Sequence, residues 1–305
     1  MTLIAGNWKM YLGPAEAGAF CRDLRNANLG DADVVVCPPY VSLAECVQAV
    51  AGTEIGVFAQ SCHWARDGAF TGEVSAPMLK ELGVYGTLVG HSERRQLFGE
   101  TDATVAKRVG AALEDGLHVI ACVGETEDER EAGETEAVLR RQVGVLDHDE
   151  NLVIAYEPVW AIGTGKTATP EIAQAAHEVI KSLLDVPVLY GGSVKPGNAA
   201  ELLAQPAIDG ALVGGASLDV DSFAAICRAS PSYRSSSSTA SAARRRGRET
   251  RSIWPTRRSS TGSGASSRTR RSKRRGRPPD CRRDRWATAR SATSRSGRGA
   301  GSIRI

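Results

Sequence analysis

The chain has no run of 18 apolar residues, so its sequence predicts no helix that crosses a membrane. It also lacks a basic segment followed by an apolar one near the N-terminus, so we expect no signal peptide. The seven cysteines are odd in number, irregularly spaced and without a Cys-x-x-Cys pair, which argues against a disulfide framework or a zinc site. These absences predict a protein of a reducing compartment, the cytoplasm.

Acidic and basic residues are divided unevenly along the chain. Residues 1–229 hold 16 Lys+Arg and 32 Asp+Glu, a net charge of −16, whereas residues 230–305 hold 22 and 3, a net charge of +19. Segments of such different charge do not form one structural unit. The second is rich in Arg, Ser, Thr and Gly and poor in apolar residues, which predicts disorder. We expect one folded domain, residues 1–229, and a disordered basic tail, residues 230–305.

Three interpretations of the basic tail stay open. Its arginine clusters would neutralise phosphates in a nucleic-acid-binding arm, or they would form a localisation patch. The composition is also that of GC-rich DNA translated in another frame, and the scarcity of lysine and the lack of repeats favour this third interpretation. Nucleic acid is therefore an expected partner only if the tail is genuine.

Short β-branched runs alternate with helical patterns over the first 229 residues. The predicted strands are residues 2–6, 33–37, 54–59, 86–89, 118–123, 152–156, 186–190 and 210–213. They are apolar on both faces, as expected for parallel strands with a core on one side and helices on the other. Helical patterns are predicted at residues 14–26, 101–113, 169–184, 198–205 and 217–228.

The number of these units favours a closed α/β barrel. Eight units over 229 residues average about 29 residues each, which suits a (β/α)8 TIM barrel of roughly 250 residues. A doubly wound open sheet is the alternative, and it would carry Gly-x-Gly-x-x-Gly after its first strand. Residues 6–10, Gly-Asn-Trp-Lys-Met, contain no such motif.

Polar residues follow several of the predicted strands. Asn7 and Lys9 follow the first, His91 the fourth, Glu157 the sixth and Ser193 the seventh. Each alone has an ordinary explanation, such as a solvated loop lysine or a hydrogen-bonded structural histidine. Because a barrel gathers the C-terminal ends of its strands on one rim, several such groups together indicate a catalytic site.

Glu157 precedes a segment with the composition of a hinged lid. Pro158 stiffens the exit from the strand, and Gly163 and Gly165 permit the backbone angles that a moving loop needs. A carboxylate beside a lid suits a base that works away from water, whereas a carboxylate that caps a loop is the alternative. The predicted lid is Pro158, Val159, Trp160, Ala161, Ile162, Gly163, Thr164, Gly165, Lys166, Thr167 and Ala168.

Glycine pairs follow the last two strands, one of them just before Ser193 and the other at Gly214 and Gly215. The N–H groups of such loops converge on an anion, and a helix N-terminus adds partial positive charge. Either pair alone would be an ordinary turn, but on adjacent strands they predict a phosphate site, to which Gly163 would add an N–H. The predicted substrate is a small phosphorylated metabolite.

Four segments, residues 6–10, 89–95, 155–165 and 190–194, resemble the signature sequences of the triosephosphate isomerase family. They occur in the family's order and approximate spacing, and the resemblance covers residues 1 to about 229. It implies interconversion of dihydroxyacetone phosphate and D-glyceraldehyde 3-phosphate through an enediolate, in glycolysis and gluconeogenesis. No metal and no cofactor would be needed.

The resemblance also implies roles for individual residues. Glu157 would be the base that moves a proton between adjacent carbons, and His91 the electrophile that polarises the substrate oxygens. Lys9 would hold the substrate and stabilise the enediolate, with Asn7 as a nearby hydrogen-bond donor. Pairing of a glutamate base with a neutral histidine is taken over from the family, and the helix start after His91 agrees with a neutral ring. The supporting residues would be Glu93, which pairs with Lys9, and Ser92 and Cys122.

A long loop, residues 60–73, follows the third predicted strand and looks like the family's intersubunit loop. The resemblance implies a homodimer in which Thr71 braces the neighbouring active site and Glu73 pairs with Arg94 of the partner subunit. A surface loop without a partner is the alternative, although its aromatic residues are unsuited to water.

Two other classes of function stay open. One is a different phosphate-binding barrel, such as a lyase or synthase, which a Schiff-base lysine within a strand would favour; none of the predicted strands contains lysine. The other is a nucleic-acid-binding protein that acts through the tail.

Overall fold

A computed structural model describes residues 2–161 and 168–231. The central lid positions Ile162 to Thr167 and almost all of the predicted tail lie outside these residues. In the described part, eight parallel strands close into a barrel in sequence order, because the first strand pairs with both the second and the last. The strands are β1 Leu3–Asn7, β2 Asp33–Cys37, β3 Gly56–Ala59, β4 Gly86–Val89, β5 His118–Val123, β6 Leu152–Tyr156, β7 Val188–Tyr190 and β8 Gly210–Val213.

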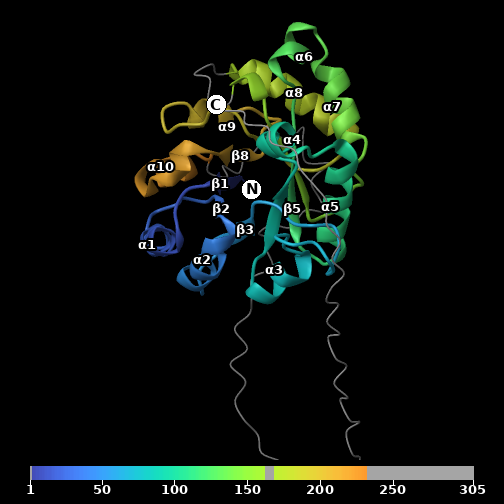
Figure 1. The fold of residues 1–305 in the computed structure, drawn as a ribbon. Coiled ribbons are helices and arrows are strands. Elements are labelled where there is room, and N and C mark those ends of the chain that lie inside the picture. Colours follow the sequence, from blue (N-terminus) through green and yellow to red (C-terminus); the bar gives the residue numbers. More distant parts are fainter. Residues whose placement is uncertain (1, 162–167, 232–305) are drawn as a thin grey trace, which may run out of the picture. The chain divides into compact units, whose positions relative to one another are not determined.

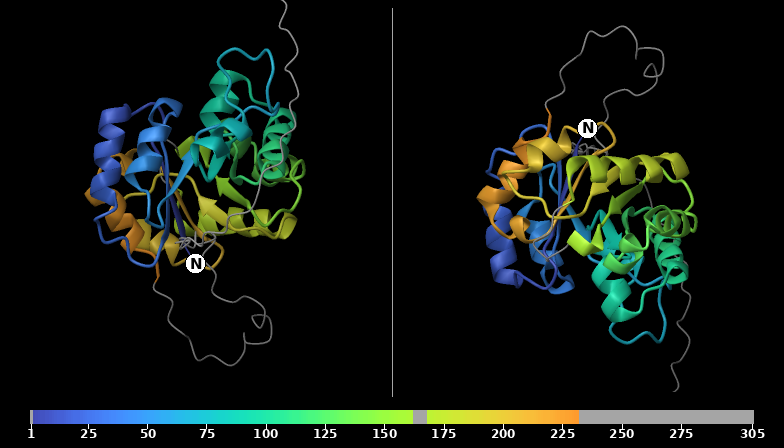
Figure 2. Two further views of the ribbon diagram at one scale, coloured as in Figure 1. Left: turned by 90° about the horizontal axis from the view of Figure 1, so that it is seen from below. Right: turned by 90° about the horizontal axis from the view of Figure 1, so that it is seen from above.

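Helices and short 3-10 turns follow the strands and surround them (Figures 1 and 2). The α-helices are α1 Pro14–Leu24, α2 Leu43–Ala49, α3 Ala76–Leu82, α4 Ser92–Phe98, α5 Asp102–Glu114, α6 Glu127–Glu131, α7 Thr135–Val143, α8 Pro170–Leu183, α9 Ala199–Leu203 and α10 Val220–Arg228. The 3-10 turns are η1 Tyr40–Ser42, η2 Val159–Ala161 and η3 Gly215–Leu218. The predicted (β/α)8 barrel is confirmed, and the open doubly wound sheet is excluded.

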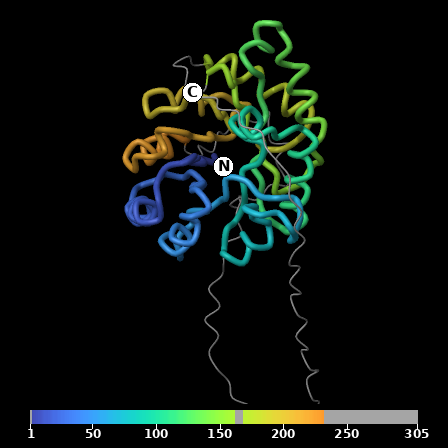
Figure 3. The backbone as a smooth tube through the Cα atoms, in the orientation of Figure 1, coloured from blue at the N-terminus to red at the C-terminus, as the bar shows by residue number. Residues whose placement is uncertain are grey.

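Side chains on the two faces of each strand enter two separate cores. Along β1, Leu3 and Ala5 point into the barrel while Ile4 packs outward against the helices. The interior core is Leu3, Ala5, Val35, Cys37, Phe58, Leu88, Ile120, Cys122, Val153, Ala155, Leu189 and Leu212. Because both faces are buried, the strands read as continuous apolar runs, which explains why they could be predicted from the sequence. Figure 3 follows the alternation of inner strand and outer helix along the backbone.

Five strands have the predicted bounds, whereas β3 and β7 each begin two residues later than predicted. Pro187, the second residue of the predicted strand, has no N–H to give to a ladder. Before β3, the Ile55 N–H donates to Thr53 Oγ1 at 3.2 Å, which keeps that residue in a turn. β1 lies one residue later than predicted, so Asn7 is its last residue.

The predicted single helix at residues 217–228 was wrong in its first part. The backbone is a 3-10 turn up to Leu218 and then extends at Asp219, with φ −119° and ψ 125°. The Asp219 carboxylate accepts the Ser222 N–H at 2.8 Å, so it caps a new helix, α10, instead of continuing the old one. The last helix therefore begins at Val220.

The loop after β3 projects from the barrel beside α5 (Figure 2). Arg108 of α5 donates to the carbonyl of Cys62. His63 stacks on Trp64 and lies tilted against Phe70, with ring centroids 4.2 Å apart in each pair. These contacts order the loop within a single chain, although the Phe70 side chain stays 45% exposed.

Candidate active site

Glu157 directly follows β6 and is only 2% exposed. Its backbone N–H donates to Val123 O of β5 at 2.7 Å. On the other side, a Cβ atom added to Gly191, just after β7, would lie 2.9 Å from Glu157 Cγ. The ends of β5 and β7 therefore enclose the stem of this side chain, and the position after β7 needs glycine.

Both carboxylate oxygens of Glu157 are held by the start of α4. His91 Nε2 lies 2.9 Å from Oε1, and the Ser92 N–H donates to Oε2 at 2.8 Å. The other imidazole nitrogen, Nδ1, accepts the Glu93 N–H at 3.2 Å. A nitrogen that accepts a hydrogen bond carries no proton, so these contacts define a neutral His91 with its proton on Nε2.

The two buried groups shift each other's pKa in opposite directions. Burial alone would raise the pKa of Glu157, but His91, the Ser92 N–H and Lys9 lower it below its usual range. Burial alone would lower the pKa of His91, but the carboxylates of Glu157 and Glu93 raise it. This upward direction opposes the expected neutral ring. We assign the neutral form because the Nδ1 contact leaves no room for a second ring proton.

Lys9 follows β1 in an uncommon backbone conformation, with φ 51°. Its N–H donates to Asn7 Oδ1 at 3.0 Å, and the Gln60 amide donates to Lys9 O at 2.7 Å. This local bonding stabilises the left-handed turn and directs the side chain across the rim, where Nζ lies 2.6 Å from Glu93 Oε1. Lys9, Glu93, His91 and Glu157 thus form one connected chain of contacts.

The predicted phosphate loops lie on the same rim. A Cβ atom added to Gly214 would lie 3.8 Å from Lys9 Cε, so the loop after β8 adjoins the ammonium group. Ser217 donates both its N–H and its hydroxyl to Gly214 O, which bends the chain into η3. Ser193 is half-buried and Gly215 is exposed, so both are open to an incoming ligand. Gly163 lies outside the described residues.

Of the remaining predicted residues, Cys122 lies in the barrel interior, whereas Thr71, Glu73 and Arg94 lie on the segments after β3 and β4. Cys122 points into the barrel core, where burial and the nearby Glu157 charge raise its pKa. Thr71 is exposed on the long loop. Within the single chain Glu73 approaches Arg108 at 3.6 Å, and Arg94 pairs with a residue of its own chain, Glu100, at 2.5 Å.

The sequence analysis missed Glu125, which lies just beyond β5 with no exposed surface. Its Oε1 accepts from Tyr156 Oη at 3.0 Å and from Trp160 Nε1 at 2.9 Å. Arg130 stacks on the Trp160 ring at 4.3 Å and approaches Glu125 at 3.3 Å. A carboxylate after an apolar strand was the signal that identified Glu157, and the same signal was available for Glu125.

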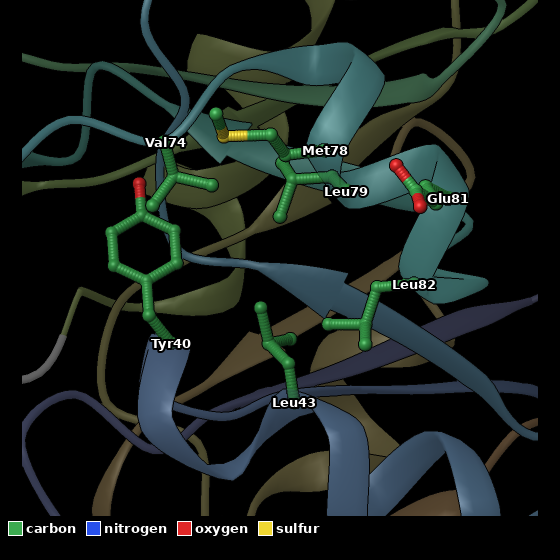
Figure 4. Close-up of a pocket in the computed structure, with 7 residues that line it drawn as sticks. All are labelled: Tyr40, Leu43, Val74, Met78, Leu79, Glu81 and Leu82. Atoms are coloured by element: carbon green, nitrogen blue, oxygen red, sulfur yellow. The ribbon is translucent and has the colours of Figure 1, made fainter.

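One cavity adjoins these groups, and a second is lined by other residues. A polar one of about 320 Å³ is lined by Ser92, Arg95, Gly124, Gln142 and Val159, among others, and so adjoins Glu157. An apolar one of about 390 Å³ lies between η1 and α3 and contains none of the groups above (Figure 4). Within residues 2–161 and 168–231, no cluster of His, Cys, Asp and Glu has the arrangement of a metal site. No helix in that part has the length and apolar character to cross a bilayer.

Comparison with known proteins identifies the family. The family model described as triosephosphate isomerase matches residues 2–230. A relative of that name from Solibacter usitatus (strain Ellin6076) is 54% identical over 242 residues, which cover 73% of this chain and 97% of the relative. Others from Carboxydothermus hydrogenoformans (strain ATCC BAA-161 / DSM 6008 / Z-2901) and Rhodopirellula baltica (strain DSM 10527 / NCIMB 13988 / SH1) are 51% and 52% identical. They cover 74% and 75% of this chain, and 98% of each relative is covered.

The matched residues, 2–230, include all eight strands of the barrel. The chain belongs to the triosephosphate isomerase family, and its reaction is the glycolytic interconversion of dihydroxyacetone phosphate and D-glyceraldehyde 3-phosphate.

Proposed function

We propose that Glu157, His91, Lys9 and Asn7 carry out this isomerisation through an enediolate. The observation that carries the proposal is the 2.9 Å contact between a buried carboxylate and a neutral imidazole on the barrel rim, within reach of one ammonium group. Few structural roles require such an arrangement, because burying a carboxylate is unfavourable unless its hydrogen bonds are arranged for it.

Glu157 acts as the base. It leaves His91 and the Ser92 N–H, turns towards the substrate and takes the proton from the carbon beside the carbonyl. The C–H electron pair becomes the enediolate double bond, and the carbonyl electrons move to oxygen. The double-bond electrons then take the proton back at the neighbouring carbon, while an electron pair of oxygen forms a new carbonyl at the carbon that lost it. The hydroxyl proton of that carbon passes to the former carbonyl oxygen, so the aldehyde and the ketone exchange places. Because its pKa is lowered, Glu157 is ionised and ready to accept a proton at neutral pH.

His91 and Lys9 stabilise the negative charge that develops on the substrate oxygens. The Nε2–H of a neutral imidazole donates to the oxygen that gains charge, and the Lys9 ammonium adds a positive charge. Asn7 fixes the left-handed turn at Lys9 and so keeps that ammonium on the rim.

Phosphate binding is proposed at the loops that carry Ser193, Gly214 and Gly215, with Gly163 of the lid as a further N–H donor. The short distance between Gly214 and the Lys9 side chain supports this, because one ammonium then serves both the phosphate and the reacting end. The lid would exclude water, which protects the intermediate from losing phosphate. Contacts of Glu125 and Arg130 with Trp160 support its N-terminal end.

A homodimer is proposed from apolar side chains exposed in the segments that follow β1 and β4. Met10, in the loop after β1, is 92% exposed, and Leu97 and Phe98, at the end of α4, are 74% and 68% exposed. A monomer would leave this apolar surface in water. The apolar cavity lined by Tyr40 of η1, Leu43 of α2 and Met78 of α3 adds apolar surface in the segments after β2 and β3 (Figure 4). Thr71, Glu73 and Arg94 would contact the partner subunit.

Residues 1–229 are proposed to be the complete isomerase domain, and the cytoplasm its compartment. The glycolytic reaction supports this location, as do six free and buried cysteines among the described residues.

The test is coupled turnover of glyceraldehyde 3-phosphate by the purified full chain and by its Glu157→Asp variant. Shortening the base by one methylene should lower kcat by about 10²-fold or more with little change in KM, since a misplacement near 1 Å has this effect. Unchanged kcat in the variant would remove Glu157 from the mechanism.

A further inference from the structure

The amide of Gln142, on α7, hydrogen-bonds both backbone groups of a single residue. Its Oε1 accepts the Gly124 N–H at 2.7 Å, and its Nε2 donates to Gly124 O at 3.2 Å. Gln142 is only 5% exposed, and Gly124 is the first residue beyond β5. The side chain therefore continues the hydrogen bonding of the barrel at the point where the strand ladder stops.

Gly124 is in direct contact with the backbone of Glu157. A Cβ atom at position 124 would lie 1.8 Å from Glu157 O and 3.2 Å from its Cα, so no larger residue fits. The neighbours of Gly124 also bond this segment, because Glu157 N donates to Val123 O and Val159 N donates to Glu125 O. Residues 123–125 thus hold the backbone of Glu157 in place through hydrogen bonds and close contact.

Arg95 ties the same strand end to the residue before His91. Its Nε donates to Gly90 O at 2.8 Å and its Nη2 to Cys122 O at 3.2 Å, while Nη1 lies 2.6 Å from Asp102. The end of β5 is therefore held by polar side chains from two helices, α4 and α7.

Hydrogen bonds position residues 123–125, because a cavity beside Gly124 leaves their packing incomplete. The polar cavity of about 320 Å³ is lined by Gly124 and Gln142 themselves, and also by Ser92 and Val159. Apart from Val159, the side chains that line this cavity are polar, so its lining offers Gly124 hydrogen bonds and little apolar packing.

We propose that Gln142 is a positioning residue for the isomerisation: through Gly124 it fixes the backbone of Glu157, and with it the reach of the carboxylate. The inference rests on the proposed role of Glu157 as the base. Gln142 touches no reacting atom, so its removal should act on the chemical step and leave substrate binding nearly unchanged.

The first experiment compares Gln142→Met with a matched change, Gln174→Met, in the full chain. Both remove a glutamine that accepts a backbone N–H. Gln174 accepts that of Ala207 at 2.9 Å, and Ala207 precedes β8 whereas the rim groups follow their strands. Gln142→Met should lower kcat about 10- to 100-fold with KM changed less than about twofold, as expected for a small displacement of a base. Gln174→Met should leave both constants within about twofold.

Gln142→Glu is the second variant, because it has the same size and keeps an acceptor for the Gly124 N–H. It loses the donor to Gly124 O, so kcat should fall even if the methionine variant folds poorly. Equal melting temperatures for the parent and Gln142→Glu, with reduced kcat, would separate positioning from stability.

A double-mutant cycle with Glu157→Asp tests whether Gln142 acts through the base. If it does, Gln142→Met should add less than about threefold to the loss already caused by Glu157→Asp. Fully multiplicative losses, or an unchanged kcat in both Gln142 variants, would overturn the inference while leaving the base intact. An unchanged kcat in Glu157→Asp alone would overturn the proposed function and this inference together.

Discussion

His91 Nε2 lies 2.9 Å from Glu157 Oε1, so in this structure the electrophile and the base of the proposed mechanism hydrogen-bond each other. This contact keeps the imidazole proton on Nε2, the nitrogen that faces the substrate oxygen in the proposed mechanism. Nδ1 is occupied by the Glu93 N–H at 3.2 Å, which prevents the ring from taking the other tautomer.

His91→Gln should therefore keep a donor near the substrate oxygen but place it less well. We expect kcat to fall by about 10²- to 10³-fold, the usual loss when one preorganised donor to a developing oxyanion is disturbed. Coupled assays at saturating substrate measure this. A control is Arg22→Gln, which breaks only an exposed pair with Glu45 and should leave kcat unchanged. Comparable activity of His91→Gln and the parent would contradict the electrophile role.

Gly191→Ala should reduce activity because the added methyl group would displace the Glu157 side chain. The added methyl carbon would lie 2.9 Å from Glu157 Cγ and 3.0 Å from Tyr156 O, closer than carbon atoms normally approach, so Glu157 must move. We expect a fall in kcat of about tenfold or more. Gly197→Ala in the same loop meets no atom within 4 Å and serves as the control. If both variants keep full activity, the packing of Glu157 against β7 does not matter for the reaction.

The sequence predicted the barrel and the residues that converge on its rim because both have local signals. A strand buried on two faces is a continuous apolar run, and Glu157 and His91 stand where such runs end. Gln142 and Arg95 could not be found in this way, since each is an ordinary residue within a helix. Which backbone atoms they reach depends on the fold, because only the folded chain brings α7 beside Gly124.

Short helices were missed for a related physical reason. α2 and α3 have seven residues each and α6 has five, about two turns or fewer, so the apolar spacing repeats too few times to be recognised. The start of α6 nevertheless has a sequence signal, because Thr126 and Glu129 form a capping box. Asp219, whose carboxylate caps α10, is likewise a residue type typical of a helix start.

His177 should make the barrel sensitive to acid. It lies fully buried on α8 between Tyr156 and Tyr190, and burial lowers its pKa to about 3 from 6.5. The hydrogen bond to Ala207 O opposes this shift, and the charge of Lys181 adds to it. Between pH 6.5 and 3 the unfolded chain binds a proton at this residue that the folded chain does not. The free energy of unfolding should therefore fall as pH falls, by up to about 1.4 kcal/mol per pH unit.

Urea midpoints at pH 7 and pH 4.5, at one protein concentration, measure this dependence. His177→Gln cannot titrate and should show a smaller difference between the two pH values than the parent. Glu157 does not confound the comparison, because its lowered pKa places its own loss of stability at lower pH. An equal pH dependence in both proteins would rule out His177 as the source.

Phe98→Glu should weaken the proposed dimer. Phe98 is 68% exposed, with Arg94 stacked on its ring at 5.2 Å, and it belongs to the helix that carries His91 at its start. A buried carboxylate at an apolar interface is strongly unfavourable. Light scattering should show dimers for the parent and monomers for the variant at the same concentration, with reduced turnover in the monomer. An exposed change on α7, Arg140→Glu, is the control, and a parent that is already monomeric and fully active would refute the dimer.

Deleting residues 232–305 should leave the isomerase intact. The family match ends at residue 230, and α10 is complete at Arg228, where Arg228 Nη1 donates to Asn28 O near the end of α1. All groups proposed to bind or convert the triose precede this point, so kcat and KM should stay within about twofold of the full chain. What should change is the affinity for polyanions, because the deletion removes most of a segment with a net charge of +19 and leaves a barrel of −16. Retention on heparin at low salt should be lost with the tail, and a truncated chain without turnover would show that the tail is part of the enzyme.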